Sequence, residues 1–301
     1  MKVTLGFDLN CFTNRYVEPE VWTEFVASCG VRCVQFNFDL IDFMLPWQVQ
    51  QSLVTRTVLC CRAKEICIKS AFGGQNHHQN YLGHPDLVVA AACESYYRRM
   101  ADLCAALGGE GFGTCFAITT TSVQRNPRRR QEVISRAVDA YHRLGEYSKE
   151  IGLKYLLYEP TSTPRETAAT FTENDELLAR LGSMAIPMRL CLDVGHRNLE
   201  TAGAPESDPY EWIRRYARVS KAIHIHQCNG QGSHHWPFID KYNAQGDITP
   251  PRILQALADS GSNQEILLAL KIRHRAYYPD EYKLEENLRA SVAYWRQWVE
   301  K

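Results

Sequence analysis

Carboxylate and imidazole side chains stand at the ends of three successive apolar runs in the second half of the chain. Glu159 and Asp193 each end such a run, and His224 and His226 lie two residues apart near the end of the third, where they face the same side of a strand. A charge at the end of a buried strand needs a partner. Two carboxylates and an imidazole suit Mn²⁺, Mg²⁺, Co²⁺ or Zn²⁺. The pattern therefore predicts one divalent metal site.

Short β-rich runs alternate with longer helical patterns along the whole chain, which is typical of parallel strands joined by crossover helices. Most of the runs are continuously apolar, as expected when both faces of a strand are covered. Eight of them are present, the number that closes a barrel. We predict one α/β domain over residues 1–301, a (β/α)8 TIM barrel. The expected strands are Thr4–Asp8, Val31–Phe36, Cys67–Phe72, Phe112–Ile118, Lys154–Glu159, Met188–Asp193, Ala222–Gln227 and Ile266–Ile272.

The segments between the runs carry helix signals. Prolines stand at or just before the expected first turns, where a missing N–H costs nothing, and glycines stand where the patterns end. Apolar residues recur at helical spacing from Val133 to Ile151, and the stretch from Pro279 to Lys301 is expected to be the last outer helix. In such barrels the chemistry collects at the C-terminal ends of the strands, so the polar strand ends are the candidate site.

Composition excludes several classes of function. The 301 residues are 45% hydrophobic and carry 34 basic and 34 acidic side chains, which shows no bias toward nucleic acids or membranes. The basic run from Asn126 to Arg130 is interpreted as a solvated turn at a helix start. The N-terminus lacks the pattern of a signal peptide, so we expect a cytoplasmic protein. The 11 cysteines are expected to be reduced thiols.

The strand ends E-P, L-D-x-x-H and H-x-H, in this order and spacing, resemble the xylose isomerase-like superfamily of sugar and sugar-phosphate isomerases and epimerases. A loop-to-helix pattern supports the resemblance, with Ala71-Phe72-Gly73-Gly74 followed by Asn80-Tyr81-Leu82-Gly83-His84-Pro85-Asp86. The segment from His226 to Phe238 is similar to members that act on tetrulose phosphates. The resemblance covers nearly the whole chain and implies a sugar or sugar phosphate as substrate.

The resemblance also implies a set of metal ligands: Glu on the fifth strand, Asp on the sixth, His on the seventh and Glu on the eighth. The first three carry over as Glu159, Asp193 and His226. The second histidine of the H-x-H motif is the ligand in the similar epimerases, so His226 is preferred to His224. His196 matches a position that helps to bind substrate near the metal.

The fourth ligand is missing from the eighth strand. Glu265 lies at its N-terminal end, and the expected carboxylate falls at Ala269 or at Lys271. One hypothesis is that Ala269 replaces a native glutamate in order to trap substrate. The other is that the chain is a divergent member in which Lys271 has a new role. We favour the first, which predicts that this chain turns over its substrate poorly.

The site predicts proton transfer next to a carbonyl. A metal chelated by a carbonyl and the neighbouring hydroxyl stabilises an enediolate, with Glu159 as the base and the missing glutamate as the second acid. A phosphate on the substrate would need cations at the mouth, and Trp236 could shield the enediolate from water. The candidate substrate-binding residues are His196, Arg197, His235, Trp236 and Lys271, with Arg273, His274 and Arg275 as further candidates for a phosphate.

Three other functions stay open. A lyase acting on 3-oxo-glycosides, as in C-glycoside-cleaving relatives, would need a second small β-rich subunit. An abasic-site nuclease would need a richer ligand cluster for three zinc ions and a basic face, which the zero net charge argues against. A non-catalytic member could bind a sugar phosphate without turnover. We expect no nucleic acid or membrane as a partner, and a homodimer is compatible with this type of barrel.

Overall fold

The computed structural model describes residues 2–74, 82–197, 203, 205–276 and 278–299. Within them the predicted barrel is confirmed: all eight strands pair in parallel and in chain order, and the first pairs with the last. The strands are β1 (Lys2–Asp8), β2 (Cys33–Asn37), β3 (Cys67–Phe72), β4 (Gly111–Cys115), β5 (Tyr155–Glu159), β6 (Met188–Asp193), β7 (Ser220–Ile225) and β8 (Glu265–Leu270).

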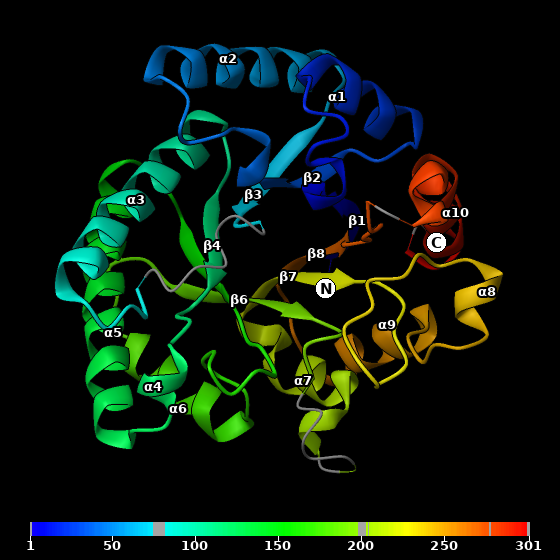
Figure 1. Ribbon diagram of the computed structural model, residues 1–301. Helices are drawn as coiled ribbons and strands as arrows, with labels where there is room; N and C mark the ends of the chain where they lie inside the picture. Colours follow the sequence, from blue (N-terminus) through cyan, green and yellow to red (C-terminus); the bar gives the residue numbers. More distant parts are fainter. Residues whose placement is uncertain (1, 75–81, 198–202, 204, 277, 300–301) are drawn as a thin grey trace.

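Helices surround the strands in a ring (Figure 1), and the C-terminal helix lies against β1, where the ring closes. Prolines stand at the first turn of several of them, as predicted. The helices are α1 (Pro19–Ser28), α2 (Trp47–Ala63), α3 (Leu87–Ala106), α4 (Thr121–Gln124), α5 (Pro127–Glu150), α6 (Phe171–Leu181), α7 (Pro209–Tyr216), α8 (Asp240–Asn243), α9 (Pro250–Asp259) and α10 (Leu284–Val299).

Three strands end earlier than the sequence predicts. The extension of the fourth strand to Ile118 is wrong, because the chain leaves the sheet after Cys115 and Phe116 stacks on Tyr141 at 4.7 Å between ring centroids. β7 and β8 also end two residues early, so His226 and Lys271 follow their strands directly. The last helix is shorter too, since Pro279–Lys283 forms a 3₁₀ turn before α10.

The barrel has two apolar cores. The larger one fills the space between the sheet and the ring of helices. The smaller one fills the inside of the barrel. Because side chains alternate across a strand, the inward side chains of successive residues i and i+2 stack in layers along the barrel axis. The side chains of the inner core, called the interior layer below, belong to more than one such level, because β5 and β8 each contribute two of them. They are Phe72, Tyr155, Leu157, Cys191, Ala222, Leu267 and Ala269.

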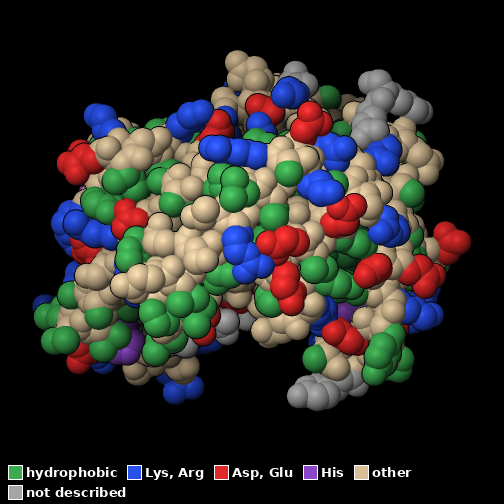
Figure 2. All heavy atoms as spheres, turned by 90° about the horizontal axis from the view of Figure 1, so that it is seen from above, with side chains coloured by type: hydrophobic (Ala, Val, Ile, Leu, Met, Phe, Trp, Pro, Cys, Tyr) green, Lys and Arg blue, Asp and Glu red, His purple; other side chains and the backbone are tan. Residues whose placement is uncertain are grey.

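The outer surface is mixed in charge. Figure 2 shows a side of the molecule on which acidic and basic side chains are interspersed among hydrophobic ones. In the described part of the chain, no helix combines the length and the hydropathy that crossing a bilayer requires. The cysteines of the described residues are free thiols, as predicted.

Gly113 on β4 tests how closely the strands that carry the site pack. A Cβ atom at this position would lie 2.1 Å from the backbone oxygen of Leu157 on β5. We therefore expect Gly113→Ala to lower the free energy of unfolding by about 1–3 kcal/mol through overpacking, measured by urea denaturation. Gly182→Ala is the matched control, since its Cβ would meet nothing nearer than 3.4 Å. Equal effects of the two substitutions would contradict this account of the packing.

Candidate active site at the mouth of the barrel

The candidate residues lie directly above the interior layer of the barrel. Glu159 ends β5, Asp193 ends β6, and Lys271 follows the last residue of β8. Each stands two residues beyond a member of the interior layer, so its side chain points to the same side of its strand. All three are nearly inaccessible to solvent. The strand period therefore brings together side chains that are separated by up to 112 positions in sequence.

The ammonium of Lys271 joins the two carboxylates. Its Nζ donates to Glu159 Oε1 at 2.8 Å and to Asp193 Oδ2 at 3.1 Å. The backbone of Lys271 is fixed to the neighbouring strand, because its N–H donates to the carbonyl of Ile225 on β7. The two acids predicted to hold a metal thus share a lysine.

The imidazole of His224 lies deeper in the barrel. His224 Nδ1 is 2.8 Å from Glu159 Oε1, and its Nε2 is 2.5 Å from Gln35 Oε1 on β2 and 3.2 Å from Asp8 Oδ2 at the end of β1. The ring is fully buried and meets Phe72 edge-on. His224 therefore connects Glu159 to the opposite side of the barrel and holds its carboxylate in place.

Three further histidines line the upper side of the acids. His226 Nε2 lies 2.9 Å from Asp193 Oδ1, and the His226 ring lies against that of His235 with a centroid distance of 4.0 Å. Burial and the neighbouring His226 hold the pKa of His235 well below its usual value. His235 is therefore a neutral imidazole whose Nδ1 donates to the carbonyl of Lys271 at 3.0 Å. His196 Nδ1 lies 3.6 Å from Glu159 Oε1.

The charges of this cluster stabilise one another. Burial alone would raise the pKa of Glu159, but Lys271 and His196 outweigh it and hold the pKa well below its usual range. The pKa of Asp193 is lowered against the same effect of burial by His196 and Lys271. The pKa of Lys271 is raised, because the attraction of Glu159 and Asp193 exceeds the effect of burying its ammonium. At neutral pH both acids and the lysine are charged.

Groups of side chains that could hold a metal are present at this mouth. One consists of Glu159, Asp193 and His224, and the other of Asp193, His196 and His235. They share Asp193, so they mark a single place in the described structure. A nuclease with three zinc ions would need more ligands than these two groups supply.

As the chain is folded, the predicted ligands do not fit a divalent ion. Lys271 occupies Glu159 Oε1 and Asp193 Oδ2, the oxygens that two adjacent strands would offer. Both nitrogens of His226 face acceptors, since Nε2 lies by Asp193 and Nδ1 lies 3.3 Å from the carbonyl oxygen of Gln227. A divalent ion bound to those two oxygens of Glu159 and Asp193 would therefore lie beside the ammonium of Lys271. We derive no chemical step through a metal here.

Other residues predicted from the sequence lie in different places. Ala269 is fully buried in the interior layer, one layer below Lys271, and it pairs with Gly6 and His224 on the neighbouring strands. Arg197 is 6% exposed and its guanidinium forms an ion pair with Asp247 at 2.8 Å. These contacts favour a role for Arg197 in positioning the loops after β6 and β7, and its contact with substrate stays a prediction.

The aromatic candidate stands at the side of the mouth. Trp236 stacks between His234 and Tyr242, with centroid distances of 3.9 and 4.9 Å. Its backbone forms an antiparallel bridge with Gln227. Trp236 therefore fixes the loop that carries His235. Asn80 and Tyr81 of the loop-to-helix motif lie outside the described residues.

A cavity of about 600 Å³ opens at the mouth between the segments that follow β1, β7 and β8. Arg15 is bound to Glu281 on its rim, with Nε 2.6 Å from Oε1. Arg273 is half-buried and donates from Nε to Asn10 Oδ1 at 3.1 Å, and Arg275 is exposed. His235 lines the cavity as well. The cavity thus joins the neutral histidine to a rim of cationic side chains.

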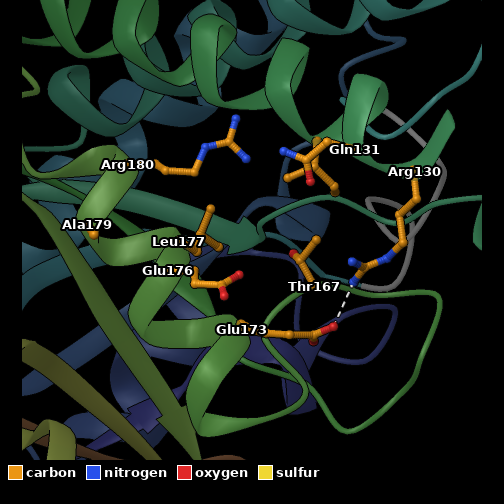
Figure 3. A pocket seen from close by; sticks show the side chains of 10 residues that line it. Arg130, Gln131, Thr167, Glu173, Glu176, Leu177, Ala179 and Arg180 are labelled. Atoms are coloured by element: carbon orange, nitrogen blue, oxygen red, sulfur yellow. Dashed lines mark hydrogen bonds and ion pairs between the residues drawn. The ribbon is translucent and has the colours of Figure 1, made fainter. Parts of the chain in front are cut away.

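A second cavity of about 350 Å³ lies on the outside of the barrel between α5 and α6 (Figure 3). An ion pair between Arg130 and Glu173 crosses its edge. None of the predicted site residues lines it. We therefore place the chemistry at the mouth.

Two members of the buried cluster were not predicted. Asp8 ends β1 and Gln35 lies within β2, and both are nearly fully buried beside His224. The signal was available: each is a polar residue in or at the end of an apolar run, which is the same criterion that singled out Glu159 and Asp193.

Comparison with known proteins agrees with the fold. Residues 23–298 match the family described as xylose isomerase-like TIM barrel. The chain is 33% identical over 301 residues to the D-erythrulose 1-phosphate 3-epimerase of Brucella abortus strain 2308, which covers 98% of this chain and 96% of that protein.

Solved structures give the same result for the fold. A protein from Rhodospirillum rubrum assigned as a candidate xylose isomerase superposes with a TM-score of 0.89 at 28% identity and covers 98% of this chain and 99% of its own. The D-psicose 3-epimerase of Clostridium cellulolyticum superposes with a TM-score of 0.69 at 15% identity and covers 99% of both chains. At that identity the likeness concerns the fold alone.

Removing the lysine tests the electrostatic account of the mouth. Lys271→Met leaves Glu159 and Asp193 buried without their cation, and we expect it to lower the free energy of unfolding at pH 7 by about 3–5 kcal/mol. Lys154→Met is the matched control, because Lys154 pairs with Glu110 at the surface and is 66% exposed. An exposed pair is worth about 0–1 kcal/mol. Urea denaturation measures both, and similar losses would contradict the account.

The same variant should change the pH dependence of stability. The folded-state pKa values of Glu159 and Asp193 are depressed, so the stability they provide is present above their unfolded pKa values of about 4 and is lost as the pH falls. Without Lys271 the pKa values are less depressed. We expect the loss of stability below about pH 4 to be shallower in Lys271→Met than in the unsubstituted chain.

Proposed function

The chain belongs to the xylose isomerase-like TIM barrel family, and from that premise we propose that it is an isomerase or epimerase of a small ketose phosphate, for example an erythrulose phosphate. The relative from Brucella acts, by its name, on a four-carbon ketose phosphate. The reaction we propose removes a proton from the carbon next to the carbonyl and forms an enediolate.

The main support for this proposal is the Oε2 atom of Glu159. Oε1 is next to Lys271 and His224, whereas Oε2 is buried and has no hydrogen-bond partner among the described residues. A buried carboxylate oxygen without a partner is costly unless it has a use, and an ionised carboxylate can accept a proton. The adjacent cationic cluster would stabilise the negative charge that develops on the substrate oxygen.

The rim of the mouth cavity supports a phosphorylated substrate. Arg273 makes one hydrogen bond to Asn10 through Nε, and its terminal nitrogens make none to the part of the chain that the structure describes. A guanidinium with unused donors at the edge of a cavity suits a phosphate, which it can bind with two parallel hydrogen bonds. A small ketose would then place its carbonyl end toward Lys271 and Glu159.

Several finer expectations from the sequence stay predictions. These are the cytoplasmic location and the homodimer, while the dependence on a divalent metal that the resemblance implies is untested. The hypothesis that Ala269 replaces a native glutamate is also untested, and the packing of that position inside the barrel does not support it. A lyase acting on 3-oxo-glycosides has no observation in its favour.

Proton exchange tests the proposed reaction. We expect the chain to incorporate deuterium from D₂O next to the carbonyl of at least one ketose phosphate in a panel of four to six carbons, followed by NMR. Glu159→Gln keeps the size of the side chain but removes the base, and should slow the exchange by about 100-fold or more. Glu132→Gln, on the exposed face of α5, is the control.

The outcome separates two interpretations. No exchange with any member of the panel, together with binding measured by calorimetry, would contradict the proposal and favour a non-catalytic binding protein. Exchange that survives Glu159→Gln would leave the reaction standing and remove Glu159 as its base.

The phosphate end is tested with Arg273→Met. Loss of a hydrogen bond to a charged group costs about 1.5–3 kcal/mol, so the KM for the phosphorylated ketose should rise about 10–100-fold. The KM for the same ketose without phosphate should not change, and kcat should change little. Arg128→Met, at the exposed start of α5, is the control. Equal changes for both ketoses would show that Arg273 does not bind the phosphate.

A further inference from the structure

We infer that the ammonium of Lys271 takes the place of the divalent cation that the family implies, and that the chain binds the carbonyl of its substrate with this lysine and without a resident metal. The inference deepens the proposed function and rests on it for the nature of the substrate. The place of the lysine is set by contacts within the chain.

The Nζ atom of Lys271 lies between the two carboxylates. It lies within hydrogen-bond distance of Glu159 Oε1 and Asp193 Oδ2, which come from two adjacent strands. The single positive charge at that point is shared by the two acids that end β5 and β6, and the three groups together keep one negative charge. A divalent ion bound to these two oxygens would lie beside the ammonium, which repels it.

The lysine is held in this place from its backbone. Its N–H donates to Ile225, and its carbonyl accepts from the imidazole of His235. Its side chain rises from the strand face that carries Leu267 and Ala269 in the interior layer. Residue 271 is only 8% exposed.

The eighth strand offers no carboxylate in place of the lysine. Glu265 is at the far end of β8, where it pairs with Lys2 and Lys69. The position that would hold a fourth ligand therefore carries the opposite charge. In this chain the side chain that arrives at the mouth from β8 is itself the cation.

One donor of the ammonium is left for the substrate. An ammonium has three N–H groups, and the described residues account for two of them. The third N–H can donate to the carbonyl oxygen of a ketose. This hydrogen bond strengthens as negative charge develops on that oxygen in the enediolate. Lys271 would thus act on the oxygen while Glu159 Oε2 takes the proton from the neighbouring carbon.

Metal binding tests the inference without reference to activity. The purified chain should hold less than about a tenth of an equivalent of any divalent metal by elemental analysis, and calorimetric titration with Mn²⁺ should show no saturable site. Lys271→Glu supplies a carboxylate in place of the ammonium, and this variant should bind Mn²⁺ at about one equivalent. Lys149→Glu makes the same change in net charge at the exposed end of α5 and should bind none.

A full equivalent of metal in the unsubstituted chain would falsify the inference. So would a folded Lys271→Glu variant, checked by circular dichroism, that does not bind Mn²⁺. If this variant does not fold, the measurement on the unsubstituted chain still decides. Because these readouts need no turnover, failure to find a substrate would count against the proposed function and leave the inference standing.

Where deuterium exchange is found, a second experiment on the exchange rate tests the role of the ammonium. EDTA should leave the exchange rate of the unsubstituted chain unchanged. Lys271→Met should lower kcat for exchange by about 100-fold or more, the usual effect of losing a donor to a developing oxyanion. Lys271→Arg keeps the charge and should retain more activity than Lys271→Met. Loss of exchange in EDTA with recovery on adding Mn²⁺ would overturn the inference.

Discussion

The contact between one lysine and two carboxylates determines how the mouth of this barrel is built. Burying three charged groups is costly, and the cost is offset only where the partners meet with good geometry. Glu159, Asp193 and Lys271 meet because their strands lie within one half of the barrel, from β5 to β8, and because each side chain stands on the interior layer. His224 adds a second support from below by contacting Glu159. The position of the carboxylate oxygens is therefore fixed by the packing inside the barrel.

The fold could be predicted from the sequence because each strand is a short apolar run with a helical pattern after it. The third and sixth strands agree with the prediction to the residue. The errors have one cause: an apolar run reads the same whether it forms a strand or a buried loop. Phe116 is apolar because it packs on Tyr141, and the hydrogen bonds of the sheet have already ended at Cys115.

The site was predicted less completely, for a reason of geometry. Glu159, Asp193 and His226 could be identified from their types and places, and the structure brings them together. Which residue of the eighth strand reaches the mouth could not be predicted, because it depends on how β8 is staggered against β7 in the closed barrel. That stagger pairs Ala269 with His224, one layer too deep, and raises Lys271 to the mouth. The same ambiguity hid Asp8 and Gln35, which contact His224 from the other side of the barrel.

The exchange of a carboxylate for a lysine has an electrostatic consequence. In the four-ligand set that the family resemblance implies, two glutamates and one aspartate around a divalent ion carry a net charge of minus one. In this chain Glu159 and Asp193 with Lys271 also carry minus one. Replacing glutamate by lysine changes the charge by two, which equals the charge of the ion. Under the proposed function, the replacement therefore preserves the net charge that a substrate would meet at the mouth. An ammonium offers directed donors where a metal offers open coordination positions, so the orientation of the substrate oxygen then depends on where the backbone of residue 271 is held.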